Sequence, residues 1–127
     1  MSNAPTVLFG LMPLARAVVR SATSGALTTN VEADDSGTLF VSLTSGTHNY
    51  VLPVVSECAG KFFIFYDAEG TAAITITGGT TDKIMGVDDA GCDTVYDDDV
   101  LGSWGMIVGD GTYYYFIAGA GTWSKTS

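Results

Sequence analysis

Short stretches of β-branched and aromatic residues, separated by Gly-containing turns about every 8–12 residues, constrain the fold of this chain more than any other feature. No segment shows the 3.6-residue periodicity of a convincing helix. Closely spaced strands without helices are typical of sandwiches and barrels. The sequence therefore predicts an all-β fold: a single antiparallel β-sandwich or barrel, jelly-roll-like, of about 7–8 short strands with an extended N-terminal arm.

The expected strands lie between residues 27 and 118. They are expected at residues 27–31, 38–43, 50–52, 61–66, 73–77, 104–108 and 113–118. In the fifth of these, Ile74 and Ile76 alternate with threonines, so the two isoleucines share one face. The 61–66 stretch is the most apolar and is expected to be central. Gly109-Asp-Gly111 predicts a tight hairpin, because Asp-Gly supplies the positive φ that such turns need.

Residues 1–26 differ from the rest and predict an N-terminal arm on a β-sandwich body formed by residues 27–127. They hold two of the three prolines, and their apolar residues show no clean period. A strand around Ala15–Arg20 or a short helix from Leu14 to Val19 would fit this stretch. Exposure of the apolar run Val7–Met12 is costly in water, so the arm is expected to lie on something, which indicates an oligomer.

Charge is strongly one-sided, because five Lys and Arg stand against fourteen Asp and Glu and give a net charge of −9. Phosphates of DNA or RNA repel such a body, so no nucleic-acid partner is expected. Residues 1–31 contain Arg16 and Arg20 and no acid, whereas residues 32–127 carry all fourteen acids. A mildly basic arm could dock onto an acidic neighbour, including a second copy; the alternative is that two arginines carry no such meaning.

The two cysteines, Cys58 and Cys92, are too few for a disulfide scaffold and lack a metal-type spacing. Two independent buried or half-buried thiols are therefore expected. No stretch reaches the ~20 apolar residues that span a bilayer, so no membrane partner is expected. A signal peptide is disfavoured because no basic residue precedes the apolar run of the arm.

Catalytic chemistry has little support in the sequence. His48 is the only histidine, and it lies in a Ser-Gly-Thr-His-Asn turn where an exposed side chain is the simplest reading. No nucleophile-elbow motif is present, and Gly78–Lys83 lacks the spacing of a phosphate-binding loop. The chain is therefore not expected to be an enzyme, and neither a catalytic residue nor a cofactor is assigned.

An acidic stretch from residue 82 to residue 99 is the only candidate for a metal site. Its carboxylates, with two more elsewhere, are Asp88, Asp89, Asp93, Asp97, Asp98, Asp99, Asp34 and Asp35. Grouped oxygen ligands can hold Ca²⁺, but the D-x-D-x-D-G pattern is absent and three of these aspartates are consecutive. A solvated acidic loop is the favoured interpretation, and no metal is assigned.

Aromatic residues cluster in two strands and near the C-terminus. Three consecutive tyrosines, Tyr113 to Tyr115, must point to both faces of a strand, so part of the cluster is core and part is surface. Exposed Tyr and Trp are typical anchors of protein interfaces, and they also stack on sugars.

Several of these segments, in this order, resemble the small virion proteins of tailed bacteriophages. The opening Leu27–Phe40, with its Asp-Ser-Gly turn, and the strand Thr47–Pro53 resemble the first elements of that pattern. Gly60–Phe65 and the Ile-Thr-Ile element of Ala73–Gly79 follow, and Gly109–Tyr115 with Gly-Thr-Trp123 resembles its closing hairpin. The likeness covers about residues 26–123.

This resemblance implies a capsid decoration (cement) or head-fibre protein without catalytic residues. Its expected place is the capsid exterior of a virion assembled in the host cytoplasm, where it would stabilise the shell by bridging major capsid proteins as a homo-trimer or homo-dimer. The alternative is a carbohydrate- or receptor-binding fibre or tail module. The residues expected to contact the capsid or a sister subunit are Val7, Leu8, Phe9, Leu11, Met12, Arg16, Arg20, Trp104, Tyr113 and Tyr115.

Overall fold

The computed structural model describes residues 15–78, 83–86 and 91–126, and the strands in these ranges form one sheet of six and one of five. The six-stranded sheet contains β1 (Ala17–Arg20), β3 (Thr38–Ser42), β5 (Phe62–Asp67), β9 (Trp104–Gly109), β10 (Tyr114–Ala120) and β7 (Ile84–Met85), in that spatial order. The five-stranded sheet contains β11 (Ser124–Thr126), β8 (Thr94–Tyr96), β6 (Ile74–Thr77), β4 (His48–Val51) and β2 (Leu27–Asn30). Two 3₁₀ turns, η2 (Ala33–Asp35) and η3 (Val55–Glu57), complete the described elements. The predicted all-β class is confirmed.

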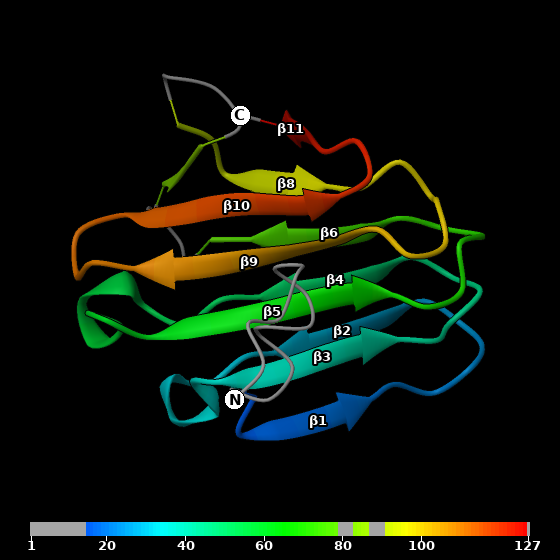
Figure 1. Ribbon diagram of the computed structural model, residues 1–127, viewed down its shortest axis with the longest axis horizontal. Helices are drawn as coiled ribbons and strands as arrows, with labels where there is room; N and C mark the ends of the chain where they lie inside the picture. The colour runs from blue at the N-terminus through cyan, green and yellow to red at the C-terminus, as the bar shows by residue number, and fades with distance from the viewer. Residues whose placement is uncertain (1–14, 79–82, 87–90, 127) are drawn as a thin grey trace, which may run out of the picture.

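The first six strands alternate between the two sheets, so that the chain coils three times around a shared interior (Figure 1). Strands β1, β3 and β5 are parallel neighbours in one sheet, and β2, β4 and β6 are parallel neighbours in the other. Ala17 pairs with Thr38 and Leu27 pairs with His48, so both strands of the first coil are offset by 21 residues from the second. This is the topology of a short solenoid, in which each turn contacts its neighbours.

The C-terminal strands close the two sheets in the antiparallel sense. Strand β9 pairs with both β5 and β10, and β8 pairs with both β6 and β11. The predicted Gly109-Asp-Gly111 hairpin joins β9 to β10. Asp110 holds this turn by accepting hydrogen bonds from the backbone N–H groups of Thr112 and Tyr113, both at 2.7 Å. Strand β7 then adds to β10 in parallel.

The prediction of a single antiparallel sandwich or barrel is wrong, because both sheets are mixed. Turn residues show where a strand ends, but they do not show which sheet the next strand joins. Here each turn between the first six strands leads to the other sheet, so strands of successive coils pair in parallel. The predicted 7–8 strands are also too few, because β7 and β8 lie inside the stretch expected to be an acidic loop. The expected strand at Ala15–Arg20 is confirmed as β1, and its pairing with β3 places it in the β body although it precedes the predicted boundary at residue 26.

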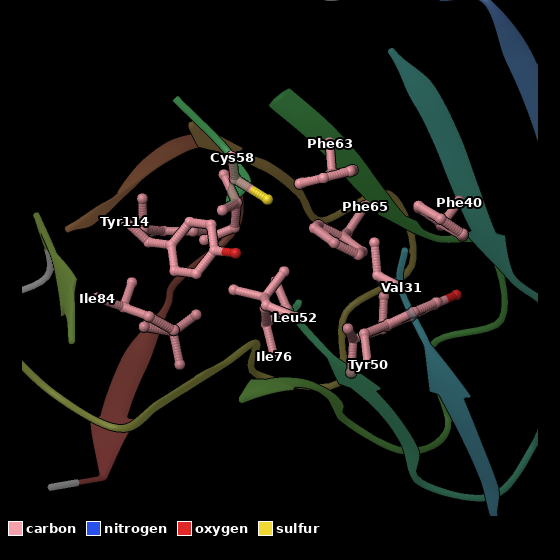
Figure 2. Packing of buried hydrophobic residues seen from close by; sticks show 14 of the residues in the cluster. Val31, Phe40, Tyr50, Leu52, Cys58, Phe63, Phe65, Ile76, Ile84 and Tyr114 are labelled. Atoms are coloured by element: carbon pink, nitrogen blue, oxygen red, sulfur yellow. The ribbon is translucent and has the colours of Figure 1, made fainter. Parts of the chain in front are cut away.

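The core lies between the sheets and is filled by inward side chains from both (Figure 2). Tyr50 of β4 packs against Phe40 and Phe65 of the opposite sheet, with ring centroids 5.5 and 4.9 Å apart. The predicted shared face of Ile74 and Ile76 is confirmed, since both side chains are buried. Both cysteines are buried as expected, and Cys92 Sγ donates to the carbonyl of Ile84 at 3.4 Å.

Close stacking of successive coils makes Gly46 difficult to replace. A Cβ atom at Gly46 would lie 2.6 Å from the backbone carbonyl carbon and oxygen of Gly25, its counterpart 21 residues earlier in the first coil. Backbone atoms of a paired turn cannot move aside as a flexible side chain can, so we expect Gly46→Ala to destabilise the fold by about 1–3 kcal/mol. Urea unfolding measures this, with Ser45→Ala at the exposed adjacent position as the control. Equal stabilities of the two variants would contradict the stacked geometry.

Candidate interaction surface

The outward face of the six-stranded sheet carries a nearly continuous apolar surface. The strand register places Val18, Leu39, Ile64, Met106 and Ile117 in one row that crosses β1, β3, β5, β9 and β10. Cα partners of neighbouring strands point their side chains to the same face, so these five side chains share the outward face. We call this set the outer row.

The rows on either side of the outer row are also largely apolar. One contains Val41, Tyr66 and Trp104, and the other contains Phe62, Val108 and Tyr115. The middle of these rows forms a second hydrophobic cluster, separate from the core between the sheets. Its members from the three rows are Leu39, Ile64, Trp104, Val41, Phe62, Tyr66 and Met106. A sheet face that is apolar over five strands is typical of a surface that another protein segment covers.

Exposure varies steeply along the outer row. The exposed fractions are 55% for Val18 and 47% for Ile117 at the two ends, but 3% for Leu39 and 0% for Ile64 in the middle. The side chains of Tyr113, just before β10, and of Tyr115, on β10, are also exposed. We call Tyr113, Tyr115 and Ile117 the β10 rim, because they lie on β10 or just before it, in the half of the sheet away from β1.

The turn before β10 holds one rim tyrosine in place. The hydroxyl of Tyr115 donates a hydrogen bond to Asp110 Oδ2 at 2.8 Å, while Asp110 Oδ1 accepts the two backbone N–H groups of the turn. These backbone donors lower the pKa of Asp110, and the bond to its carboxylate raises the pKa of Tyr115. The ring therefore loses little additional side-chain entropy when a partner packs on it.

The structure distributes the residues predicted to make contacts as follows. Val7, Leu8, Phe9, Leu11 and Met12 lie outside the described residues. Tyr113 and Tyr115 are exposed on the β10 rim, and Arg20 is exposed on β1. Arg16 is exposed too, and its guanidinium donates hydrogen bonds to the backbone carbonyls of Ser36, at 3.0 Å, and Asp34. Trp104 is buried on the outward face, because its indole packs where a side chain at Gly119 would otherwise stand.

Two apolar members of this surface, Val18 and Ile117, were not among the predicted contact residues. Period-two alternation would have found Ile117, because it shares a face with Tyr115 two positions earlier. Val18 carries no such signal, since its place in the outer row depends on parallel pairing with β3.

His48 is buried, which corrects the prediction of an exposed turn histidine. Its side chain is 2% exposed, with Ser42 Oγ 3.0 Å from Nδ1 and Thr29 Oγ1 2.7 Å from Nε2. It also stacks on Tyr50, with ring centroids 4.0 Å apart. The residue opens β4 rather than ending a turn, so its side chain faces the interior. Burial lowers the pKa of His48 to about 4, and the ring is therefore neutral at physiological pH.

The second buried polar feature is a pair of aspartates, Asp67 at the end of β5 and Asp97 just after β8. Asp67 Oδ1 accepts the backbone N–H groups of Glu69 and Gly70, and Asp97 Oδ1 accepts that of Ile74. The second oxygen of each carboxyl has no donor among the described residues. Burial, followed by a side-chain hydrogen bond with Asp67, raises the pKa of Asp97 to about 8. With its pKa raised, Asp97 keeps its proton at neutral pH and can itself act as a donor.

The acidic stretch is thus not one solvated loop as predicted. Asp97 is buried, and Asp93 forms an exposed ion pair with Lys83 at 2.6 Å. Asp88 and Asp89 lie outside the described residues. Within the described ranges, no group of three or more His, Cys, Asp or Glu side chains is arranged to hold a metal ion.

An open groove of about 570 Å³ lies at the far ends of β2 and β4. Its lining includes Asn30, Glu32, Leu52, Val54 and Glu57. None of its lining residues is aromatic, so it lacks the stacking platform that a sugar site needs. Among the described residues, no helix is long and apolar enough to cross a membrane.

Comparison with known proteins adds no relative: no protein-family model and no curated protein matches this chain.

The buried titratable groups predict an unusual dependence of stability on pH. Unfolded Asp97 releases its proton near pH 4 and folded Asp97 near pH 8, so between these values its contribution to stability falls by about 1.4 kcal/mol per pH unit. His48 acts in the opposite sense, because its lowered pKa makes stability rise between about pH 4 and 6.5. The two effects oppose each other below pH 6.5, and only that of Asp97 remains above it.

We therefore expect the free energy of unfolding of the wild-type protein to fall by about 2 kcal/mol between pH 6.5 and 8, because folded Asp97 loses its proton in this range. Asp97→Asn removes the loss, because an amide can still accept from Ile74 N–H and donates permanently to Asp67. Urea unfolding at pH 6.5 and 8 measures the difference, with the exposed Glu57→Gln as a charge-matched control. A steep fall retained in the Asp97 variant would show that another group is responsible.

Proposed function

We propose that this protein is a structural virion component that binds the outer surface of a tailed-phage capsid and stabilises it by bridging major capsid proteins. The observation that carries the proposal is the β10 rim: Tyr113, Tyr115 and Ile117 are exposed together on a sheet face that is apolar across five strands. The resemblance of the chain to phage decoration and head-fibre proteins supplies the identity of the partner.

The chemistry of the rim favours a protein partner. Tyrosine offers a large apolar ring and a polar hydroxyl at a low cost in side-chain entropy, which is why it is frequent at interface hot spots. The net charge of −9 disfavours nucleic acid as the ligand. A small protein with a flat apolar face and an anchored tyrosine is suited to binding another protein surface.

Capsid stabilisation would follow from thermodynamic linkage between binding of this protein and assembly of the shell. A ligand that binds only the assembled shell lowers the free energy of that state by an amount that grows with its concentration and affinity. Several rims presented by one homo-trimer or homo-dimer would turn modest single contacts into durable attachment. Arg20 on the exposed strand β1 would add a cationic contact at the other side of the sheet.

The environment of His48 supports a non-enzymatic role. Both ring nitrogens lie within hydrogen-bond distance of hydroxyl oxygens. The ring is buried between the two sheets. A general base needs an accessible nitrogen beside the group that it deprotonates and an orienting partner on the other nitrogen. The His48 network instead satisfies polar atoms inside the fold.

A carbohydrate- or receptor-binding fibre module is the second candidate, and one feature favours it. The exposed rings of Tyr113 and Tyr115 stand next to the exposed carboxylate of Asp110. Aromatic faces beside a carboxylate are suited to stacking and hydrogen bonding with a sugar. A glycan array would reveal this activity, and Tyr115→Ala would abolish it.

Co-sedimentation with capsids that lack the protein tests the main proposal. We expect saturable binding at a fixed ratio to the major capsid protein. Ile117→Lys should weaken it about tenfold or more, because a charge would be buried at the contact. Val54→Lys is the matched control, since Val54 is similarly exposed but lies outside the six-stranded sheet.

Two results would count against capsid binding through this face. A folded protein that does not sediment with capsids would exclude the capsid as its partner and favour the glycan-binding candidate. Equal weakening by Ile117→Lys and Val54→Lys would show that the β10 rim is not the contact surface.

A further inference from the structure

Two connections between strands meet at one end of the molecule, and each of them starts from a buried aspartate (Figure 1). Asp67 ends β5 and is followed by the connection to β6, residues 68–73, which we call the β5–β6 turn. Asp97 follows β8 and begins the connection to β9, residues 97–103, which we call the β8–β9 loop. The side chains of both aspartates are 2% exposed, so this end of the fold contains two carboxyl groups that are shielded from water.

Backbone hydrogen bonds fasten the two connections to each other. The carbonyl of Asp67 accepts from Gly102 N–H, and its N–H donates to the carbonyl of Ser103, both at 2.8 Å. At the start of β6, the carbonyl of Ile74 accepts from Asp97 N–H at 3.1 Å, and Ile74 N–H donates to Asp97 Oδ1 at 2.9 Å. Each aspartate is therefore bound to the chain segment that follows the other one.

The ionisation of Asp97 changes the balance of charge at this junction. The second oxygen of each carboxyl, Oδ2, is buried without a donor among the described residues. Burial, followed by the contact with Asp67, raises the pKa of Asp97 to about 8. While Asp97 keeps its proton, at most one negative charge is buried there. When Asp97 ionises, two negative charges are buried close together, and this arrangement is costly in a low-dielectric interior.

The surrounding elements offer no cation that would offset the second charge. Strands β4, β5, β6, β8 and β9, the β5–β6 turn and the β8–β9 loop contain neither Lys nor Arg. Burial keeps His48 of β4 neutral. The other titratable groups of these elements are acids or phenols: Tyr50, Tyr66, Asp67, Glu69, Tyr96, Asp98 and Asp99. Ionised Asp97 can therefore gain a favourable environment only by reaching water.

The β8–β9 loop is suited to open without the rest of the fold. Between Asp97 and Ser103, none of its residues is buried, so its displacement uncovers no part of the core. Asp99 has a φ of 63°, and among the described residues it is the one non-glycine residue with a positive φ. Such strain persists only while the surrounding contacts hold the backbone. The loop also exposes 63% of Leu101, so little burial keeps it closed.

We propose that Asp67 and Asp97 form a pH-sensitive latch, which closes the β8–β9 loop on the β5–β6 turn while Asp97 is protonated and opens it when Asp97 ionises. The two sheets stay folded when the latch opens. The exposed apolar side chains of Val100 and Leu101 are carried by this loop, so opening changes where the molecule presents them. This inference does not rest on capsid binding.

Amide hydrogen exchange in the full-length protein tests the latch. In the open loop the carboxyl of Asp97 ionises near pH 4, whereas in the closed loop it keeps its proton up to about pH 8. The equilibrium constant for opening should therefore rise about 15-fold between pH 6.5 and 8. We expect the exchange of Gly102 N–H and Ile74 N–H, corrected for the intrinsic effect of pH, to rise by this factor. Low concentrations of urea should not change it, because local opening exposes little surface, whereas exchange of the buried Leu52 should increase with urea.

Two variants show whether Asp97 controls the loop. Asp97→Asn should abolish the rise with pH, whereas Asp98→Asn removes an exposed carboxylate from the same loop and should retain it. A rise that survives in Asp97→Asn would overturn the proposal, since another group would then open the loop. The wild-type protein alone provides a second decision. If Gly102 exchanges with the same protection and the same urea dependence as Leu52, only global unfolding occurs and no separate latch exists.

Discussion

Packing of Tyr50 between Phe40 and Phe65 is the interaction on which the rest of the molecule depends. It joins a strand of one sheet to two strands of the other, and successive coils can stack in parallel only while both sheets share this interior. Individual parallel pairs of four or five residues are weak. The aromatic contacts hold both sheets at once, and they place Ile64 and its neighbours on the opposite, outward face.

Polar residues sit at one end of this interior, where β3 and β5 finish and β4 begins. Ser42, His48 and Asp67 lie there, and the hydroxyls of Ser42 and Thr29 satisfy the histidine ring. A Ser, a His and an Asp so close together suggest a hydrolase, but the histidine's partners are hydroxyls on both sides. Burial changes what each group does: the histidine stays neutral, and the pKa of Asp97 is raised. These polar groups hold together the end of the interior where β3 and β5 finish and β4 begins. The apolar outward face of the six-stranded sheet is on the other side of that sheet.

Sequence reasoning located most strands because their signal is local. The alternation of Ile74 and Ile76 and the three consecutive tyrosines at the start of β10 each indicate which side chains face inward. Tyr114 is indeed buried between two exposed neighbours. Strands β7 and β8 were missed because acidic residues surround short apolar stretches there. His48 was misplaced because the turn residues before it gave no sign that a buried strand begins at this position. Trp104 has an apolar surface that fits either a core or an interface, and only its neighbours decide between the two.

The sequence by itself determined the β class, the hairpin at Asp110 and the separate character of the two thiols, because these depend on residues close together in the chain or on simple composition. Tertiary structure alone decided that the first six strands coil between two sheets, since parallel pairing joins residues 21 or more positions apart and leaves no short-range pattern. The outer row is also a feature that tertiary structure alone decided. Its five apolar side chains come from five strands distributed between Val18 and Ile117, and only the register of the sheet brings them into one surface.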